Sequence, residues 1–418
     1  MKIHFASAAL TIVCLGLSAM ATRAAEVSPA KTSLTIPINV ANRPAGAVEC
    51  TFALGPTAPI TALAFGPEGK TLAVGGYREV LLWDLAEAKL ARRIPVEGYV
   101  GSLTFLKDGK TLAVGEGTPW KAGAVRFVDV ASGKETFRFA EPKDVVCSMA
   151  LSPDGKLLAA TASGKVAYVL DVAGQKLAKT LEGHTGRVLH VAFSADGKLL
   201  VTAGDDYTAQ IWDVGAWTSP AKFTESFPVR GSAFHPDGVQ VLLAVGGADG
   251  SGLRFRKTDS PTFRRPIALA MAVPLGMIGP SAKTGRVYVP CTDKTVKVFD
   301  IKSGSLVLTL AGHQDWVHAV ALSPDETKLA SGSADGTVRI WATLDGRPLA
   351  TLAQLTPRTD QWLIVTAQGH LATSSPDVLS WKAENLVTPL DQVTAKLQDA
   401  ALVGKTIAGD KVPAPVLK

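Results

Sequence analysis

Cysteine is scarce in this sequence, and its scarcity excludes a disulfide-based architecture. Only 4 of the 418 residues are cysteines, and Cys14 lies in an apolar segment near the N-terminus. If that segment is removed, Cys50, Cys147 and Cys291 remain. At most one intramolecular disulfide could then form, so we expect these thiols to be free and buried. The sequence also has no CxxCH motif, which excludes covalently attached c-type haem.

Motifs that carry catalytic chemistry are absent as well. The sequence contains no GxSxG, HExxH, glycine-rich phosphate loop or EF-hand loop. Asp205 and Asp249 remain as candidate carboxylates, although both lie in turn-rich segments where Asp is common. Four histidines show no metal-ligand spacing, and they are His190, His235, His318 and His370. We therefore expect no catalytic residue, no metal and no cofactor.

The excess of positive over negative charge is also modest. The formal net charge is +6, and charged residues make up 19% of the chain. The main basic cluster lacks interleaved aromatic residues, so we expect no nucleic-acid binding. We interpret the cluster as a solvated outer strand that discourages edge pairing, with binding of an acidic polymer as the alternative. Its members are Arg254, Arg256, Lys257, Arg264 and Arg265.

The N-terminal apolar run has the features of a secretory signal. Met1 and Lys2 precede an apolar stretch that reaches Met20 and is followed by small residues. The run is short and has no stop-transfer flank, which argues against a membrane anchor. We therefore predict a signal peptide over residues 1–21, cleavage at Ala19-Met20-Ala21, and a periplasmic or secreted protein with no stable membrane insertion. Residues 22–45 are predicted to be a linker with one possible strand at residues 34–40.

The chain does contain a repeat. An apolar residue is followed by a turn rich in Pro, Asp and Gly at intervals of about forty to forty-six residues, with one double interval before the last copy. The aligned residues are Phe65, Phe105, Leu151, Phe193, Phe234 and Leu322. Asp293 and Phe299 belong to a degenerate copy that fills the double interval. The six aligned copies and the degenerate copy make seven repeats. Each copy contains short alternating strands separated by turn residues.

Two of the repeats share a set of four polar side chains. Gly-His occurs at residues 183–184 and 312–313, and each His is followed by Ser or Thr, then Asp, then Trp at matching spacings. The sets are His184, Thr202, Asp206 and Trp212, and His313, Ser331, Asp335 and Trp341. These segments resemble WD40 repeats, whose blades are four-stranded antiparallel sheets. The resemblance implies that each set is a hydrogen-bonded structural tetrad inside one blade.

The resemblance implies an all-β fold, a seven-bladed β-propeller over residues 46–350. Residues 48–54 are expected to complete blade seven and close the ring, with residues 348–352 competing for that place. The register of blade six stays open because Pro274 and Pro280 interrupt its first strand. Residues 351–418 are predicted to form an extension with a hairpin (361–366 and 370–373), a helix from Thr388 to Gly404, and a disordered tail. This predicted extension loosely resembles the tails of exported bacterial WD40 proteins.

WD40 relatives commonly hold partners on the narrower top face of the ring, through fixed positions in the blade loops. The resemblance therefore implies a non-catalytic protein-protein interaction scaffold of the cell envelope, which we expect to be a monomer within a larger complex. A propeller enzyme acting on a small molecule and an envelope-polymer binder are the alternatives. The predicted partner-binding residues are Tyr99, Trp120, Arg187, Leu189, Asp205, Arg230, Trp316 and His318.

Overall fold

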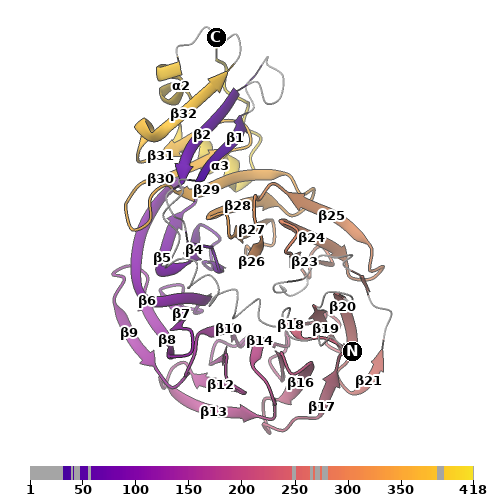
Figure 1. The fold of residues 1–418 in the computed structure, drawn as a ribbon. Helices are drawn as coiled ribbons and strands as arrows, with labels where there is room; N and C mark the ends of the chain where they lie inside the picture. The colour runs from indigo at the N-terminus through magenta and orange to yellow at the C-terminus, as the bar shows by residue number, and fades with distance from the viewer. Residues whose placement is uncertain are drawn as a thin grey trace, which may run out of the picture.

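The chain folds into a ring of antiparallel sheets with a smaller unit on one side (Figure 1). The computed structural model describes residues 32–38, 41, 48–54, 58–246, 251–263, 267–268, 274, 281–383 and 390–417. Seven successive groups of strands surround one axis, which confirms the predicted all-β propeller with a C-terminal extension. Asp249, Pro280, Arg264 and Arg265 lie outside the described residues, as does the predicted signal segment.

The blades are built from strands that follow one another along the chain. Blades one and two share the long strand β6, which is the outer strand of blade one and continues as the inner strand of blade two. Blades one to four comprise β3 (Ala62–Phe65), β4 (Thr71–Gly75), β5 (Tyr77–Asp84), β6 (Lys89–Phe105), β7 (Thr111–Thr118), β8 (Ala122–Asp129), β9 (Glu135–Phe139), β10 (Val146–Leu151), β11 (Leu157–Ala162), β12 (Val166–Asp171), β13 (Lys176–Glu182), β14 (Val188–Phe193), β15 (Leu199–Gly204), β16 (Thr208–Asp213) and β17 (Ala221–Thr224).

Blades five to seven continue the pattern, with blade six the least regular. Blade six shows three strands among the described residues, and Pro274 adds a single bridge to Cys291. Most of its first-strand region lies outside the described residues, so its register stays a prediction. The strands are β18 (Val229–Phe234), β19 (Gln240–Val245), β20 (Gly252–Lys257), β21 (Ser260–Phe263), β22 (Ile267–Ala268), β23 (Arg286–Pro290), β24 (Thr295–Asp300), β25 (Leu306–Ala311), β26 (Val317–Leu322), β27 (Lys328–Ser333), β28 (Thr337–Ala342) and β29 (Pro348–Gln354).

The recurring turn between the first two strands of a blade has a local cause. In blade three the Ser152 hydroxyl donates to Asp154 Oδ1 at 2.6 Å and accepts from the Leu157 N–H at 2.9 Å. Gly155 has a φ of +79°, in the left-handed region that favours glycine. The same hydroxyl-to-carboxylate bond recurs at Ser194 and Ser323. The Ser-x-Asp turn therefore reverses the chain at the same place in blades three, four and seven.

The hydrophobic core is divided into layers between neighbouring blades. A distinct buried cluster joins each successive pair, including blades seven and one, so every sheet has both faces covered. Representative cluster members, one from each of the two blades that meet, are in chain order Leu82 and Leu112, Phe127 and Leu158, Val169 and Leu200, Ile211 and Val241, Leu242 and Val287, Val298 and Leu329, and Ile340 and Leu72. The ring is therefore stabilised by burial of apolar surface between blades.

The prediction that residues 48–54 close blade seven is wrong. Strand β2 (Val48–Leu54) pairs with β1 (Thr32–Ile38) and with β32 (Leu379–Ala383), outside the ring. The edge of β28 is already occupied by β29, which follows it through a short turn and so pairs at a small entropic cost. At the junction of blades seven and one, the Ile60 N–H donates to the Ser333 carbonyl at 3.0 Å. All four strands of blade seven therefore come from the C-terminal part of the chain.

The extension continues the sheet of blade seven. Strands β30 (Trp362–Thr366) and β31 (Leu371–Thr373) form the predicted hairpin, and β30 pairs with β29. After η1 (Pro376–Val378) and β32, two short helices follow in place of one, α2 (Leu390–Leu397) and α3 (Ala400–Ala408). None of the described helices is long and apolar enough to cross a membrane. The proposed cap at Thr388 lies outside the described residues.

The sequence predicted that Gly404 ends the helix, and this prediction is wrong. Gly404 lies inside α3, where a Cβ would overlap the carbonyl oxygen of Ala86. The missing side chain lets α3 approach the turn between β5 and β6. The helix begins instead at Asp399, which accepts from the Leu402 N–H at 2.9 Å, and it ends at Gly409 with a φ of +103°.

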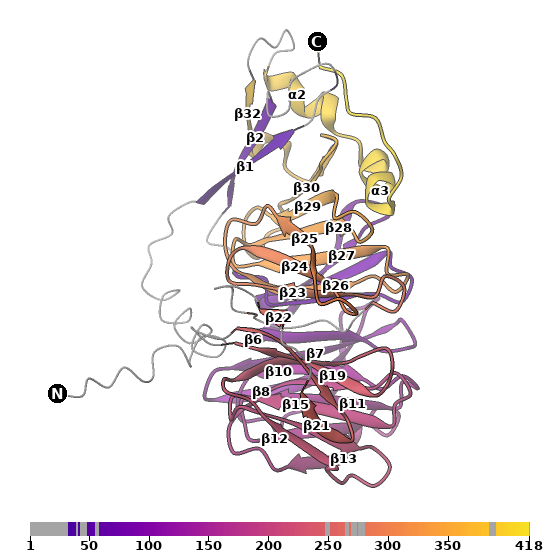
Figure 2. The same cartoon turned by 90° about the vertical axis from the view of Figure 1, so that its right-hand side faces the viewer.

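The C-terminal tail packs against the extension in an ordered conformation. The prediction of a disordered tail is therefore wrong. His370 Nε2 lies 2.9 Å from the Pro413 carbonyl oxygen, and the Ala41 N–H donates to the Pro415 carbonyl at 2.8 Å. Leu417 is buried in a second core formed by the sheet β1-β2-β32, helix α2 and the outer side of β29 and β30. Figure 2 shows this unit beside the rim of the ring, with the N-terminal strands β1 and β2 next to β32.

We expect this second core to tie both ends of the chain to the propeller. Leu397 of α2 is fully buried in it, so Leu397→Ala should lower the free energy of unfolding by about 2–5 kcal/mol. Gln392→Ala, an exposed position on the same helix, serves as the control. Urea unfolding measures both variants. Equal stability of the two would show that α2 does not depend on the second core.

Candidate functional site

The four side chains of the blade-four tetrad, His184, Thr202, Asp206 and Trp212, lie in one connected network. His184 Nδ1 is 3.0 Å from Asp206 Oδ2, and His184 Nε2 is 2.8 Å from the Thr202 hydroxyl. The Trp212 indole N–H donates to the same hydroxyl at 2.9 Å. His184 and Thr202 are buried, so the network joins the loop before β14 to β15 and β16 from inside the blade.

Blade seven repeats this arrangement with Ser in place of Thr. His313 Nδ1 lies 3.0 Å from Asp335 Oδ2, and His313 Nε2 lies 2.8 Å from the Ser331 hydroxyl. The Trp341 indole N–H donates to that hydroxyl at 2.9 Å. Asp335 also accepts hydrogen bonds from Thr337 and from the Gln314 N–H, so the carboxylate is fully engaged within the blade.

The environment of the blade-four tetrad favours a neutral histidine facing an ionised aspartate, and the tetrad aspartate of blade seven is also ionised. Burial lowers the pKa of His184. Burial would raise the pKa of Asp206, but hydrogen bonds from Thr208 and from the Thr185 N–H hold it below its usual value. Burial acts in the same sense on Asp335, whose pKa is nevertheless lowered to about 2 by the hydrogen bond from His313. These values suit a fixed structural network.

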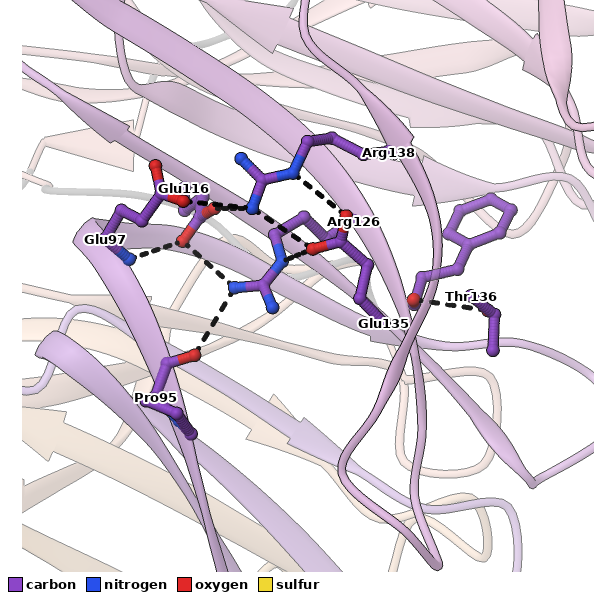
Figure 3. A network of polar contacts seen from close by, with 8 residues as sticks. Pro95, Glu97, Glu116, Arg126, Glu135, Thr136 and Arg138 are labelled. Atoms are coloured by element: carbon purple, nitrogen blue, oxygen red, sulfur yellow. Dashed lines mark hydrogen bonds and ion pairs between the residues drawn. The ribbon is translucent and has the colours of Figure 1, made fainter.

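Blade two uses ion pairs where blades four and seven use the tetrad (Figure 3). Val114 pairs with Arg126 in the register in which Thr202 pairs with Gln210, so Val114 occupies the tetrad hydroxyl position. The Arg126 guanidinium lies 3.5 Å from Glu116, which is 2% exposed, and it also pairs with Glu135.

Arg138 completes the ion-pair network of blade two. Its guanidinium lies 3.3 Å from Glu97 and 3.7 Å from Glu116 (Figure 3). Hydrogen bonding from Arg138, followed by that from Arg126, lowers the pKa of Glu135. These carboxylates therefore face cations of the same blade, and we read the network as structural.

Two pairs of the predicted partner-binding residues lie close together. Arg187 forms an ion pair with Asp205 at 2.6 Å, and its N–H donates to the same carboxylate. The Trp316 ring centroid lies 6.4 Å from that of His318. Burial lowers the pKa of His318 to about 4, so its imidazole is neutral at neutral pH.

The described residues include no group of three or more His, Cys, Asp or Glu placed to hold a metal. Cys50 and Cys291 are buried and form no disulfide. Burial raises the pKa of both thiols to about 12, so neither offers a thiolate at neutral pH.

Comparison with known proteins places this geometry in a family. The family model described as "WD domain, G-beta repeat" matches residues 48–84, 133–170, 175–213 and 304–342. The target of rapamycin complex subunit wat1 of Schizosaccharomyces pombe is 30% identical over 239 residues, which cover 52% of this chain and 74% of that protein. The chain belongs to the WD40 family. The first matched segment includes β2, which in this chain pairs with β32 outside the ring.

Other WD40 relatives match over smaller shares of their length. Nuclear distribution protein PAC1 of Ajellomyces capsulatus is 33% identical, over 39% of this chain and 31% of that protein. A U3 small nucleolar RNA-associated protein 15 homolog of Xenopus laevis is 28% identical, over 50% of this chain and 40% of that protein. Among solved structures, a chain of the mitotic checkpoint complex aligns with a TM-score of 0.61 at 20% identity, over 68% of this chain and 90% of that chain. That likeness supports the fold alone.

These relatives contradict the predicted location. They are named as a target of rapamycin complex subunit, a nuclear distribution protein and a nucleolar RNA-associated protein, and they point against a periplasmic or secreted protein. The prediction of an exported envelope protein is therefore wrong. None of the three is named for a catalytic activity.

Only some of the predicted partner-binding residues of this WD40 chain are exposed to solvent. Trp120 is 64% exposed, whereas Tyr99, Leu189 and Arg230 are each at most 8% exposed. Repeat alignment fixes the position of a residue along a strand but not what covers it. Tyr99, for example, lies against the ring of Tyr77, with centroids 4.6 Å apart.

Two exposed aromatic residues of the top face were missed. Tyr77 and Tyr207 are each 37% exposed; Tyr77 begins β5 of blade one, and Tyr207 lies in the turn between β15 and β16 of blade four. Tyr207 follows the tetrad Asp206 directly and has a φ of +65°. An aromatic residue next to the tetrad Asp was the sequence signal that could have found it.

We expect the tetrad hydroxyl to contribute strongly to stability. Thr202→Val keeps the shape but leaves the Trp212 N–H and His184 Nε2 without their buried partner, which should cost about 2–6 kcal/mol. Thr224→Val makes the same change at an exposed position of β17 and should cost little. Thermal and urea unfolding measure the difference. A loss below about 1 kcal/mol in Thr202→Val would contradict the network's role.

His190 of β14 should make the free energy of unfolding depend on pH. His190 Nδ1 accepts from the Ser232 N–H at 3.2 Å, and burial lowers its pKa from 6.5 to about 4. Between these values the unfolded chain binds a proton that the folded chain does not, so stability falls as pH falls. His190→Asn keeps an acceptor near Nδ1 without the titration. Urea unfolding from pH 7 to 4.5 should show a slope smaller by about 1 kcal/mol per pH unit in the variant. Unchanged slopes would assign the pH dependence to other groups.

Proposed function

We propose that this WD40 chain is a non-catalytic protein-interaction scaffold whose top face binds a protein partner. The observation that carries the proposal is the set of exposed aromatic side chains in rigid top-face turns, Trp120 and Tyr207 first. Aromatic residues bury much area at a small entropic cost and dominate binding hot spots. Rigid loops on a closed scaffold are where binding residues concentrate.

The backbone around these residues supports the proposal. Trp120 has a φ of +62° and Tyr207 a φ of +65°, conformations that a bulky side chain seldom adopts. The Trp120 N–H donates to the buried Asp144 carboxylate at 3.2 Å, which fixes the turn. Strained aromatic residues held exposed on a fixed turn are a recognised pointer to function.

Polar groups beside these aromatic residues suit a protein partner. Arg187 and Asp205 form a partly exposed ion pair that could orient a partner at the rim, and Trp316 is half-buried beside His318. The proposal keeps Trp120, Arg187, Asp205, Trp316 and His318 from the sequence prediction and adds Tyr207 and Tyr77. Tyr99, Leu189 and Arg230 act as supports for the face and not as contacts.

The basic cluster of blade five offers less support for a polymer binder. Arg256 lies 2.6 Å from Glu225, whose carboxylate is largely buried. Its charge is therefore balanced within the fold. Two of the cluster's five members lie outside the described residues. We propose no nucleic-acid or polymer binding.

The named relatives guide the kind of assembly proposed. One is named as a subunit of a complex, and the structural neighbour comes from a multi-protein complex. We propose by analogy that this chain is a single subunit within a larger assembly, without a cofactor and without stable membrane insertion. Because WD40 folds host many roles, the partner must be found by experiment.

The test compares the two faces of the ring. Proteins retained by the immobilised chain from extract of the cells that express it are identified, and direct affinities are then measured with each purified candidate. Trp120→Ala with Tyr207→Ala should weaken binding at least about 30-fold, as expected for hot-spot residues. Leu344→Ala removes a side chain that is 78% exposed in the turn at the opposite end of β28, and it should leave the affinity unchanged. Loss in the Leu344 variant alone would place the partner on the other face.

A further inference from the structure

Strand β25, the outer strand of blade six, carries no charged residue and has a neighbour on one side only among the described strands. The sheet order is β23-β24-β25, which leaves one edge of β25 open on the rim of the ring (Figure 1). Its sequence is Leu-Val-Leu-Thr-Leu-Ala, and Leu306 and Val307 are 51% and 40% exposed. An open apolar edge presents backbone N–H and C=O groups that can pair with another strand.

The outer strands of the other blades are protected against such pairing. Strand β21 of blade five contains Pro261, which has no N–H to donate to a neighbour. Blade seven covers its outer strand β29 with β30. In blades one to four the outer strand carries charged side chains, which disfavour pairing at an edge. Examples are Arg92 in β6, Arg138 in β9, Lys179 in β13 and Lys222 in β17. The described part of blade six has none of these protections.

Strand β29 shows what fits such an edge, because it is the counterpart of β25 in the next blade. Residues 309–311 pair with β24 in the register in which residues 351–353 pair with β28. Both segments read Thr-Leu-Ala, and each strand has its register shift at the same place. The outer edge of β29 pairs with β30, whose sequence Trp-Leu-Ile-Val-Thr is uncharged. The open edge of β25 is therefore the kind of edge that β30 occupies in blade seven.

The size of the edge favours an extended peptide over a second folded copy of the chain. A stable interface between folded proteins takes about 20–30 residues on each side. Strand β25 offers 6 residues. An added strand needs no larger area, because main-chain hydrogen bonds supply its affinity and alternate side chains supply its specificity. The uncharged edge matches an uncharged strand, since charged side chains placed against Leu308 and Leu310 would lose hydration without gaining a partner.

We propose that β25 binds an extended, uncharged, apolar segment of a partner protein as an added antiparallel strand, which becomes the new outer strand of blade six. Four residues of the segment lie opposite residues 308–311, as residues 363–366 of β30 lie opposite residues 350–353 of β29. The site lies on the rim of the ring, and it does not depend on the partner-binding role proposed for the top face.

The probe is a peptide with the sequence of residues 360–367, which contains β30, extended by two lysines at its C-terminal end for solubility. It is added to the full chain while hydrogen–deuterium exchange is followed by mass spectrometry. Exchange of alternate backbone amides in β25 should slow by about 10-fold or more, because those amides gain hydrogen-bond acceptors. The same peptide with Ile364→Pro is the control, and it should give no protection because proline cannot donate to the ladder.

Variants of the full chain test the edge itself, at two exposed positions of β25. Val307→Lys with Ala311→Glu leaves the net charge unchanged and gives β25 charges like those of β13, where Glu182 is the counterpart of Ala311. This variant should bind the peptide at least about 5-fold more weakly. Val307→Thr with Ala311→Gln changes the same positions without charge and should bind within about 2-fold of the native chain. The Trp120→Ala, Tyr207→Ala variant should also bind normally, which separates this site from the top face.

Three results would overturn the proposal. The first is an unchanged exchange rate in β25 with the peptide, or equal peptide binding by the charged and uncharged variants. The second is faster exchange in β30 without protection of β25, which would show that the peptide replaces β30 in blade seven. The third is protection of β25 that rises with protein concentration in the absence of peptide, which would assign the edge to a second copy of the chain.

Discussion

The structure depends on one constraint, that every blade must bury two apolar faces against two neighbours. A single four-stranded sheet cannot do this alone, and only a closed ring gives each sheet a partner on both sides. The described residues meet the constraint with a buried cluster at every junction. Closure at blades seven and one uses side-chain packing and the bond from Ile60 to Ser333, not a strand shared between the two ends. The strand that could have been shared, β2, joins β32 outside the ring instead.

Once the ring is closed, the polar interior of each blade can vary. Blades four and seven hold the tetrad around Thr202 and Ser331, and blade two holds an ion-pair network around Arg126 and Glu116. Blade one has Val74 in the same register, and the indole N–H of Trp83 has no partner among the described residues. The register keeps the position of the tetrad hydroxyl in all four blades, and it is filled by Thr or Ser in blades four and seven and by Val in blades one and two. Blades one and two, which lack the tetrad, therefore bury polar groups different from those of blades four and seven.

The sequence predicted the ring well because its signals are periodic. The Ser-x-Asp-Gly turns and the spacing from His184 to Trp212 recur at fixed intervals, and a period survives the loss of individual residues. Single events were harder. The pattern of residues 48–54 suits an outer strand, but nothing in it states which edge the strand will meet. Gly404 looked like a helix end, yet it is glycine because α3 approaches Ala86. Burial of Tyr99 follows from Tyr77, which one repeat read in isolation does not show.

Strand β29 connects the ring to the terminal unit, and its alternation makes the two cores neighbours through one backbone. Leu352 faces the junction of blades seven and one, whereas Ala353, the next residue, faces the second core. Helix α3 reaches the same junction, since Val403 and Ile407 belong to the cluster that contains Trp83. The buried cluster that closes the ring therefore includes side chains of the extension, and a change of packing at this junction alters the environment of both units.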